Sequence, residues 1–162
     1  MALNAYLKLK GQTQGDIKGS VTQAGRADMI MVIAVQHEVT SPRDAASGLP
    51  TGKRQHHPFV ITKEIDKASP LLYNLLVNNE NVTEWELQFW RPSPSGAEVQ
   101  FYTVQLVNAS IAWIRSIMPN NKHPDLMKFA EYEEIGFCYQ KITWTWMDGG
   151  IQSTDDWEAP VA

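Results

Sequence analysis

Residues 82–96, VTEWELQFWRPSPSG, decide the fold. In their first nine residues the apolar Trp85, Leu87 and Phe89 alternate with polar side chains, which is the period of a strand with one buried face. The following RPSPSG is rich in the proline, serine and glycine typical of turns. It leads into AEVQFYTVQLVNASIAWIRSI, residues 97–117, which again has the pattern of a strand. The stretch therefore predicts a β-hairpin.

Four further stretches predict strands. LNAYLKLK (residues 3–10) alternates between apolar and polar side chains, and PFVITKEI (residues 58–65) is interpreted as a strand after a long loop. EYEEIGFCYQKITWTWM (residues 131–147) is interpreted as one final strand. MIMVIAV (residues 29–35) is continuously apolar, so we expect one strand covered by the core on one face and by a helix or another chain on the other.

DKASPLLYNLLVNN, residues 66–79, predicts the one helix. Ser69 followed by Pro70 is a typical N-cap with proline at the first helical position. The helix is expected to end near Asn78 and Asn79 and to bury one leucine face, formed by Leu72, Leu75 and Leu76. The predicted fold is mainly β, a two-sheet β-barrel or sandwich with one flanking α-helix and a long extended loop.

Length and composition indicate one folded domain over residues 1–162. The chain is 43% apolar and 20% charged, a composition typical of a folded soluble protein. Its single cysteine, Cys138, excludes an internal disulfide. The opening MALNAYLKLKGQTQG lacks the pattern of a signal peptide, and no apolar run approaches the roughly 18 residues of a membrane span. We therefore expect synthesis in the cytoplasm, no membrane insertion, and export only by dedicated machinery.

The acidity of the chain is concentrated in its tail. The net charge is −4, and residues 147–162 contain four acidic side chains and no Lys or Arg. The rest of the chain has 14 acidic and 14 basic residues. A body without a basic stripe argues against nucleic acid as a partner.

The segment SPRDAASGLPTGKRQHHPF, residues 41–59, is too long for an ordinary connection between two strands. Such connections usually have about two to six residues, and longer ones tend to be functional or disordered. Its prolines and glycines stiffen the chain, so residues 41–57 are expected to project as an extended loop. The segment is locally basic.

No sequence motif for catalysis is present. G-x-S-x-G, H-E-x-x-H, C-x-x-C and a glycine-rich phosphate loop are all absent. His56 and His57 are adjacent, so in an extended segment their rings point to opposite sides and do not favour one metal ion. EYEE, residues 131–134, offers carboxylates that could act on a glycosidic bond, but a polar edge entering a strand is the favoured interpretation. We predict no enzymatic activity, no cofactor and no metal.

The tryptophans leave an alternative open. Trp85, Trp90, Trp113, Trp144 and Trp146 could form a platform on which sugars stack, as in a monomeric β-sandwich that binds carbohydrate. Their placement at alternate positions in strands suits a role in the core at least as well.

A long run of the chain resembles a known family. HEVTSPRDAASGLPTGKRQHHPFVITKEIDKASPLLYNLL, residues 37–76, resembles the signature of the hemolysin-coregulated protein (Hcp) family, the tube subunits of the bacterial type VI secretion system. YLKLKGQTQGDIKG near the start is similar to the family's first strand and turn, and YQKITWTW and DDWEAP near the end resemble its last strand and tail. Glu158 departs from the family, because a basic residue is expected there.

The resemblance implies a subunit of a six-membered ring. Rings stack into a tube that lies inside a contractile sheath, is capped by a spike protein and is driven into a neighbouring cell. The tube carries small effector proteins in its lumen, and the subunit is itself exported. Compact members of the family are not enzymes, and we expect no toxin domain after residue 162. A phage tail-tube subunit is similar in architecture and would share the ring.

Three sets of residues are the candidate contacts in such an assembly. The extended loop, which we expect to touch the adjacent ring, contributes Ser41, Pro42, Arg43, Asp44, Gly48, Pro50, Gly52, Lys53, Arg54 and His56. The tail contributes Asp155, Asp156, Trp157 and Glu158, which we expect to attract the basic loop of the next ring. The lateral contact within a ring is expected at Met31, Ile33 and Val35.

Overall fold

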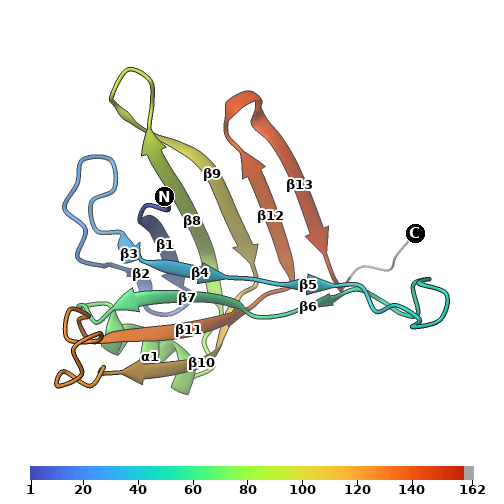
Figure 1. Cartoon of the computed structure of the whole chain (residues 1–162), viewed down its shortest axis with the longest axis horizontal. Coiled ribbons are helices and arrows are strands. Elements are labelled where there is room, and N and C mark those ends of the chain that lie inside the picture. The colour runs from blue at the N-terminus through green and yellow to red at the C-terminus, as the bar shows by residue number, and fades with distance from the viewer. Residues whose placement is uncertain (159–162) are drawn as a thin grey trace.

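The computed structural model describes residues 1–158 and contains two antiparallel sheets, a short two-stranded ribbon and one α-helix (Figure 1). The large sheet has the order β13, β12, β9, β8, β1, and both β2 and β3 pair with the free edge of β1. Its strands are β1 (Ala5–Gly11), β2 (Gly15–Ile17), β3 (Ile30–Val32), β8 (Val82–Pro92), β9 (Glu98–Val107), β12 (Lys141–Trp146) and β13 (Ile151–Asp156).

The small sheet has the order β10, β11, β7, β4. These strands are β4 (Ala34–Gln36), β7 (Phe59–Glu64), β10 (Ser110–Ile117) and β11 (Tyr132–Cys138). The ribbon is β5 (Val39–Thr40) with β6 (Gln55–His56), and it leaves the body on the side of β12 and β13 (Figure 1). The helix α1 (Ser69–Val77) packs on β10, and a short 3-10 turn η1 (Asp148–Gly150) precedes β13.

The predicted hairpin is confirmed as β8 and β9 and supplies the centre of the core, but residues 97–117 form two strands, β9 in the large sheet and β10 in the small one. β8 pairs with β9 so that Trp85 lies opposite Leu106 and Leu87 opposite Val104, and all four side chains are buried. The Trp85 ring meets Phe59 and Phe137 of the small sheet edge to face, with ring centroids 5.1 and 5.5 Å apart. The core therefore lies between the two sheets, as alternating strands with one apolar face require.

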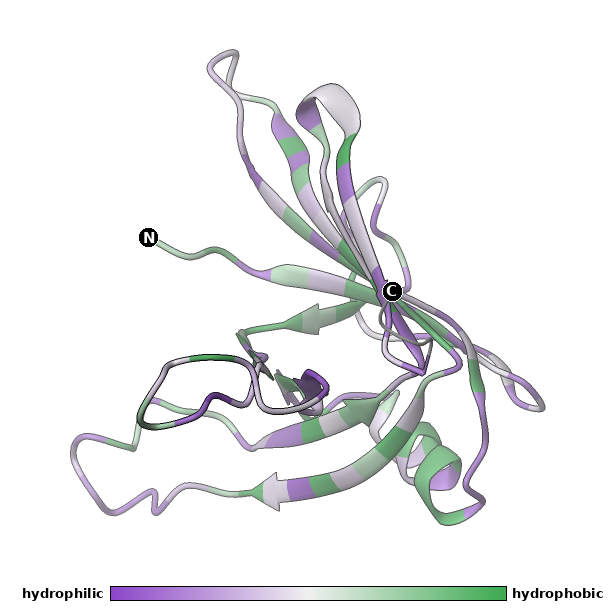
Figure 2. Cartoon of the chain, turned by 90° about the vertical axis from the view of Figure 1, so that its right-hand side faces the viewer, coloured by the Kyte–Doolittle hydropathy of each residue, from purple (hydrophilic) through white to green (hydrophobic). Residues whose placement is uncertain are grey.

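The sheets form a sandwich and do not close into a barrel. Both sheets have free edges, at β13 and at β2 and β3 in the large one, and at β10 and β4 in the small one. In Figure 2 the two sheets meet on the right of the view and diverge toward the left, where the N-terminus lies, and a groove lined by Leu3, Val35 and Phe89 opens between them. The mainly β fold with one flanking helix is confirmed, and of the two architectures expected it is the sandwich.

The helix is confirmed, but its N-cap is wrong by one residue. Ala68 occupies the cap position, and Ser69 is the first helical residue. The Ser69 hydroxyl is used elsewhere, because it donates to Glu133 and accepts from the Asp66 amide. Leu72 and Leu75 are buried and Leu76 partly so, and the helix ends at Val77 with Asn78 as its C-cap, close to the expected end. In the described part of the chain, no helix is long and apolar enough to span a bilayer.

The expectation of one strand at residues 29–35 is wrong. Residues 30–32 form β3 in the large sheet, the chain crosses between the sheets at Ile33, and residues 34–36 form β4 in the small sheet. Val32 is buried, whereas Ile33 and Val35 are 45% and 37% exposed. A continuous apolar run is typical of a strand covered on both faces, but here its second half faces the open side of the sandwich.

The expectation of one final strand at residues 131–147 is also wrong. The chain leaves the small sheet after Cys138, turns at Tyr139 and Gln140, and enters the large sheet as β12. The tail then adds β13 at the edge of that sheet, with Thr154 opposite Thr143. The predicted acidic tail over residues 147–162 is thus partly a strand, and its residues 159–162 lie outside the described part.

Candidate functional site

Residues 41–54 form the arm, a loop that projects from the ribbon beyond both sheets (Figure 1). It has its own backbone hydrogen bonds, from Thr51 to the Pro42 carbonyl at 3.0 Å and from Asp44 to the Leu49 carbonyl at 2.8 Å. The Asp44 carboxylate also accepts from the amide and hydroxyl of Ser47. Almost all of its side chains are exposed and none belongs to the core. The arm is therefore an ordered extension that contributes little to the stability of the domain.

One hydroxyl contacts both legs of the arm, which are the segment 37–40 that leads into it and the segment 55–57 that leads out of it. The Tyr139 oxygen lies 2.7 Å from His37 Nε2, just before β5, and 2.7 Å from His56 Nδ1 in β6. Tyr139 is buried, and the His56 side chain is only 2% exposed. Burial raises the pKa of Tyr139 well above its usual range, with the Asp155 charge adding to the effect, so this group remains a neutral hydroxyl.

The arm is also tied to the last strand. Arg54 donates from Nε and Nη2 to the two carboxylate oxygens of Asp155, at 2.5 and 2.6 Å, and from Nη2 to the Asp156 carbonyl at 3.0 Å. The His56 Nε2 atom lies 2.7 Å from Asp155 Oδ2. The bonds from Arg54, and secondarily from His56, hold the pKa of Asp155 below its usual range, so its carboxylate is charged.

The tail completes this junction. The Trp157 indole donates to the Tyr139 carbonyl, and its ring lies 5.9 Å from the His56 ring. The Glu158 amide donates to Asp156 Oδ1. The structure thus brings Arg54 and His56, both predicted as residues of the extended loop, together with the predicted tail residues inside one chain. The other arm cations, Arg43 and Lys53, are exposed.

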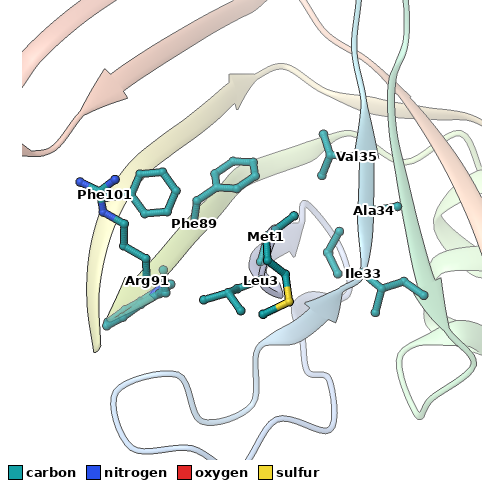
Figure 3. Close-up of a pocket in the computed structure, with 12 residues that line it drawn as sticks. Met1, Leu3, Ile33, Ala34, Val35, Phe89, Arg91 and Phe101 are labelled. Atoms are coloured by element: carbon teal, nitrogen blue, oxygen red, sulfur yellow. The ribbon is translucent and has the colours of Figure 1, made fainter. Parts of the chain in front are cut away.

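A second feature is an apolar groove on the open side of the sandwich, which we call the wedge (Figure 3). Its volume is about 430 Å³. Its walls come from the N-terminus, from β4, from the last residues of β8 and from the first half of β9. Phe89, Phe101 and Arg91 form one wall in Figure 3, with the Arg91 guanidinium 4.6 Å from the centre of the Phe101 ring. Ile33 and Val35 face them from the opposite side.

The wedge contains two of the three residues predicted for the lateral contact. Ile33 and Val35 line it, but Met31 lies in a different groove beside residues 20–23 and 64–66. The difference follows from the crossing at Ile33, because Met31 belongs to β3 and the other two follow it into β4. The backbone of β4 pairs with β7 on one edge only, and its residues Ala34 and Val35 line the wedge.

The tryptophans are not assembled into one platform. Trp85 fills the core, and Trp144 packs against it. The other three pair with separate cations: Trp90 with Arg26, Trp113 with Arg115 and Trp146 with Arg91. These rings are distributed over β8, β10 and β12. The arrangement favours structural roles over sugar stacking.

Sequence reasoning missed three residues of greatest interest. Tyr139 and His37 carry no signal in their spacing, because they meet only when the chain turns between the sheets. Glu133 was interpreted as part of a polar edge, but it is buried and lies 2.6 Å from Lys63 Nζ. The sequence did contain a signal for this pair. In FVITKE, Lys63 lies on the same face of the strand as Phe59 and Ile61, and a lysine on a buried face needs a buried acidic partner. Within residues 1–158, no cluster of His, Cys, Asp and Glu suits a metal ion.

Comparison with known proteins identifies the family. Residues 6–146 match the family described as "Type VI secretion system effector, Hcp". The chain belongs to this family. It is 42% identical to the "Major exported protein" of Pseudomonas aeruginosa, an alignment that covers 100% of this chain and 99% of that one.

Solved structures of Hcp proteins agree. One described as the crystal structure of Hcp protein has a TM-score of 0.89 at 35% identity and covers 96% of this chain and all of its own. Hcp1 from enteroaggregative E. coli, solved as a mutant, has a TM-score of 0.85 at 34% identity, covering 96% and 99% of the two chains. The secreted protein Hcp3 of Pseudomonas aeruginosa has a TM-score of 0.79 at 34% identity, with the same coverage. The predicted family is thus confirmed.

Proposed function

We propose that the chain is a structural subunit of the type VI secretion tube, which forms six-membered rings that stack and are exported. The observation that carries the proposal is the arm: an ordered, solvent-exposed extension fastened to the body at both of its legs. An isolated domain gains little stability from such an extension, because none of its side chains belongs to the core. A stacking subunit gains a rigid contact with the ring above or below it.

The arm supplies defined chemistry for stacking. Asp155 already neutralises Arg54 within the chain, so the charges left for a neighbouring ring are mainly Arg43 and Lys53. Each exposed ion pair contributes only about 0 to 1 kcal/mol, but a ring of six subunits repeats every contact six times. This charge makes stacking sensitive to salt.

The wedge supports a lateral contact between subunits of a ring. Ile33, Val35 and Leu3 are apolar and exposed around it, and the adjoining strand β4 has an unpaired edge. A second copy that fills the wedge would remove this apolar surface from water, at about 25 cal/mol per Å². Ile33 and Val35 are therefore the proposed lateral residues.

A carrier role agrees with the outer face of the large sheet. Lys8, Glu84 and Gln105 point away from the core there, and Lys8 and Glu84 form an exposed ion pair at 3.6 Å. A polar sheet face of this kind suits a water-filled lumen that holds small effector proteins. The proposed partners are further copies of the chain, the spike protein, the contractile sheath and these effectors. The proposed role needs no catalysis and no cofactor.

Light scattering on the protein as it leaves a sizing column, followed by negative-stain imaging, tests the proposal. A mass near six times the 18.3 kDa chain with ring-shaped particles is expected. Ile33→Asp should shift the mass toward the monomer, whereas Val77→Asp, at an exposed position at the end of α1, should leave the ring intact. Circular dichroism confirms that both variants fold. A folded monomer in the wild-type protein at high concentration contradicts the proposal and favours a monomeric binding module.

A further inference from the structure

A continuous chain of four polar side chains links the arm to the last strand. Asp155 contacts His56, His56 contacts Tyr139, and Tyr139 contacts His37, with each heavy-atom distance 2.7 Å. These residues come from β13, β6, the turn after β11 and the segment before β5. The donor and acceptor in each link depend on where the imidazole protons are.

With both histidines neutral, every link is satisfied. His56 donates from Nε2 to the Asp155 carboxylate, and its bare Nδ1 accepts the Tyr139 proton. The Tyr139 oxygen then accepts from Nε2 of His37. This arrangement uses one donor and one acceptor at each link, so none of these groups is left unpaired.

One added proton on His56 is also accommodated. The charged ring donates from Nε2 to Asp155 and from Nδ1 to the Tyr139 oxygen. The Tyr139 hydroxyl reverses and donates to His37 Nε2, which must then be the neutral tautomer with its proton on Nδ1. Every link is again satisfied, and the new charge lies against a carboxylate.

A second proton cannot be accommodated. With both rings charged, His37 and His56 each present an N–H to Tyr139, and the hydroxyl proton has no acceptor left in the chain. Two cations then flank one buried hydroxyl. An unpaired buried donor destabilises the closed latch, and repulsion between the two charged rings adds to this. Burial first, and then the charges of His56 and His57, lower the pKa of His37.

We infer that the chain Asp155, His56, Tyr139 and His37 is a proton-sensitive latch, which holds both legs of the arm with no or one added proton and releases the His37 leg when both rings are charged. The charged and titratable groups that face the latch are Arg54, Asp156, His57 and Cys138. The apolar rings around it belong to Phe59, Trp144 and Trp157. The latch is a property of the single chain and does not depend on the proposed ring.

The sign of the pH effect follows from His37. Because its pKa is lowered while the latch is closed, opening the latch takes up a proton below the ordinary histidine value of 6.5. Closure is therefore complete above pH 6.5 and weakens as the pH falls through the depressed value. One proton taken up per opening changes the equilibrium by up to about tenfold per pH unit.

Hydrogen exchange of the wild-type protein from pH 8 to pH 5, corrected for the intrinsic rate, measures the opening. The reporters are amides at the arm base, including that of His57, which donates to the Glu38 carbonyl at 3.1 Å. Their protection should be constant above pH 6.5 and fall below it, while amides in β8 and β9 stay protected. Flat protection over the whole range overturns the inference.

Variants separate the latch from general acid sensitivity. In His37→Gln the amide still donates to Tyr139 but does not titrate, so the acid step should vanish while protection at neutral pH is kept. His123→Gln, far from the hydrogen-bonded chain in the sequence and outside it, should retain the step. Tyr139→Phe removes the shared hydroxyl and should lower protection at every pH. An acid step that survives in His37→Gln overturns the inference, as does its loss in His123→Gln.

Discussion

The ammonium group of Lys63 lies 2.6 Å from a carboxylate oxygen of Glu133, and neither side chain is more than 1% exposed. The ammonium also contacts Asp66 at 3.0 Å, and it donates to the Glu64 carbonyl at 2.9 Å and to the Ser69 hydroxyl at 3.1 Å. The pair joins β7 to β11 and fastens the start of α1 to the small sheet.

Removing one member of this pair should be costly. Glu133→Ala leaves a buried ammonium that keeps only Asp66 as a charged partner, and loss of one member of a buried pair typically costs about 3 to 5 kcal/mol. We expect a clear drop in the urea midpoint. Glu131→Ala, two residues earlier and exposed, is the matched control and should change the midpoint little. Equal effects of the two substitutions would contradict this account of the pair.

The cations of the arm should have different roles. Arg43→Ala with Lys53→Ala should weaken tube formation by purified rings and reduce its dependence on salt, because these exposed charges are the ones free to meet another ring. Arg54→Ala should instead loosen the arm base, since Arg54 binds Asp155. Stacking in low and high salt, with hydrogen exchange of the arm, distinguishes them. Stacking that is insensitive to salt in the wild type rules out the electrostatic contact.

Acid stability should depend on Asp155. Its lowered pKa means that the folded state favours the charged carboxylate, so Asp155 contributes stability that is complete above the ordinary value of 3.8. This contribution is lost as the pH falls through the depressed value. Asp155→Asn should therefore reduce the free energy of unfolding at neutral pH and make its decline below pH 3.8 shallower. Denaturant titrations at several pH values give both quantities, and parallel curves would argue against this assignment.

Gly136 should not tolerate a side chain. A Cβ at this position would lie 2.4 Å from Nε1 of Trp113, which crosses over it from β10. Overpacking of this kind costs about 1 to 3 kcal/mol, so Gly136→Ala should lower the melting temperature. Gly52→Ala, where nothing lies within 4 Å, should not. In a Trp113→Ala background the cost at Gly136 should shrink, and a cost that persists there would implicate the backbone instead.

The sequence predicted those elements whose apolar and polar side chains follow the period of a strand or a helix. The period of two at Trp85, Leu87 and Phe89 places the hairpin and its buried face, and Leu72 and Leu75 place the helix. Alternation says nothing about which sheet a strand joins, so the crossing at Ile33 and the turn at Tyr139 were missed. β13 was missed because IQSTDD has no apolar face: it is an edge strand with most of its side chains exposed.

The candidate site was partly predictable for the same reason. The unusual length and the prolines and glycines of residues 41–57 mark the arm, because such a connection is rare between adjacent strands. Its attachment depends on Tyr139 and Asp155, which lie 83 and 99 residues beyond His56 in the chain. Contacts of such separation leave no local pattern in a single sequence.

The attachment of the arm to β13 also orders events during synthesis. Residues 41–54 leave the ribosome about a hundred residues before Asp155, which holds Arg54 and His56 in place. Domains generally fold as units while the chain is being made, with earlier segments waiting for later partners. A nascent chain thus exposes the arm before Asp155 is available to orient Arg54 and His56, so the arm is fastened only once β13 has been made.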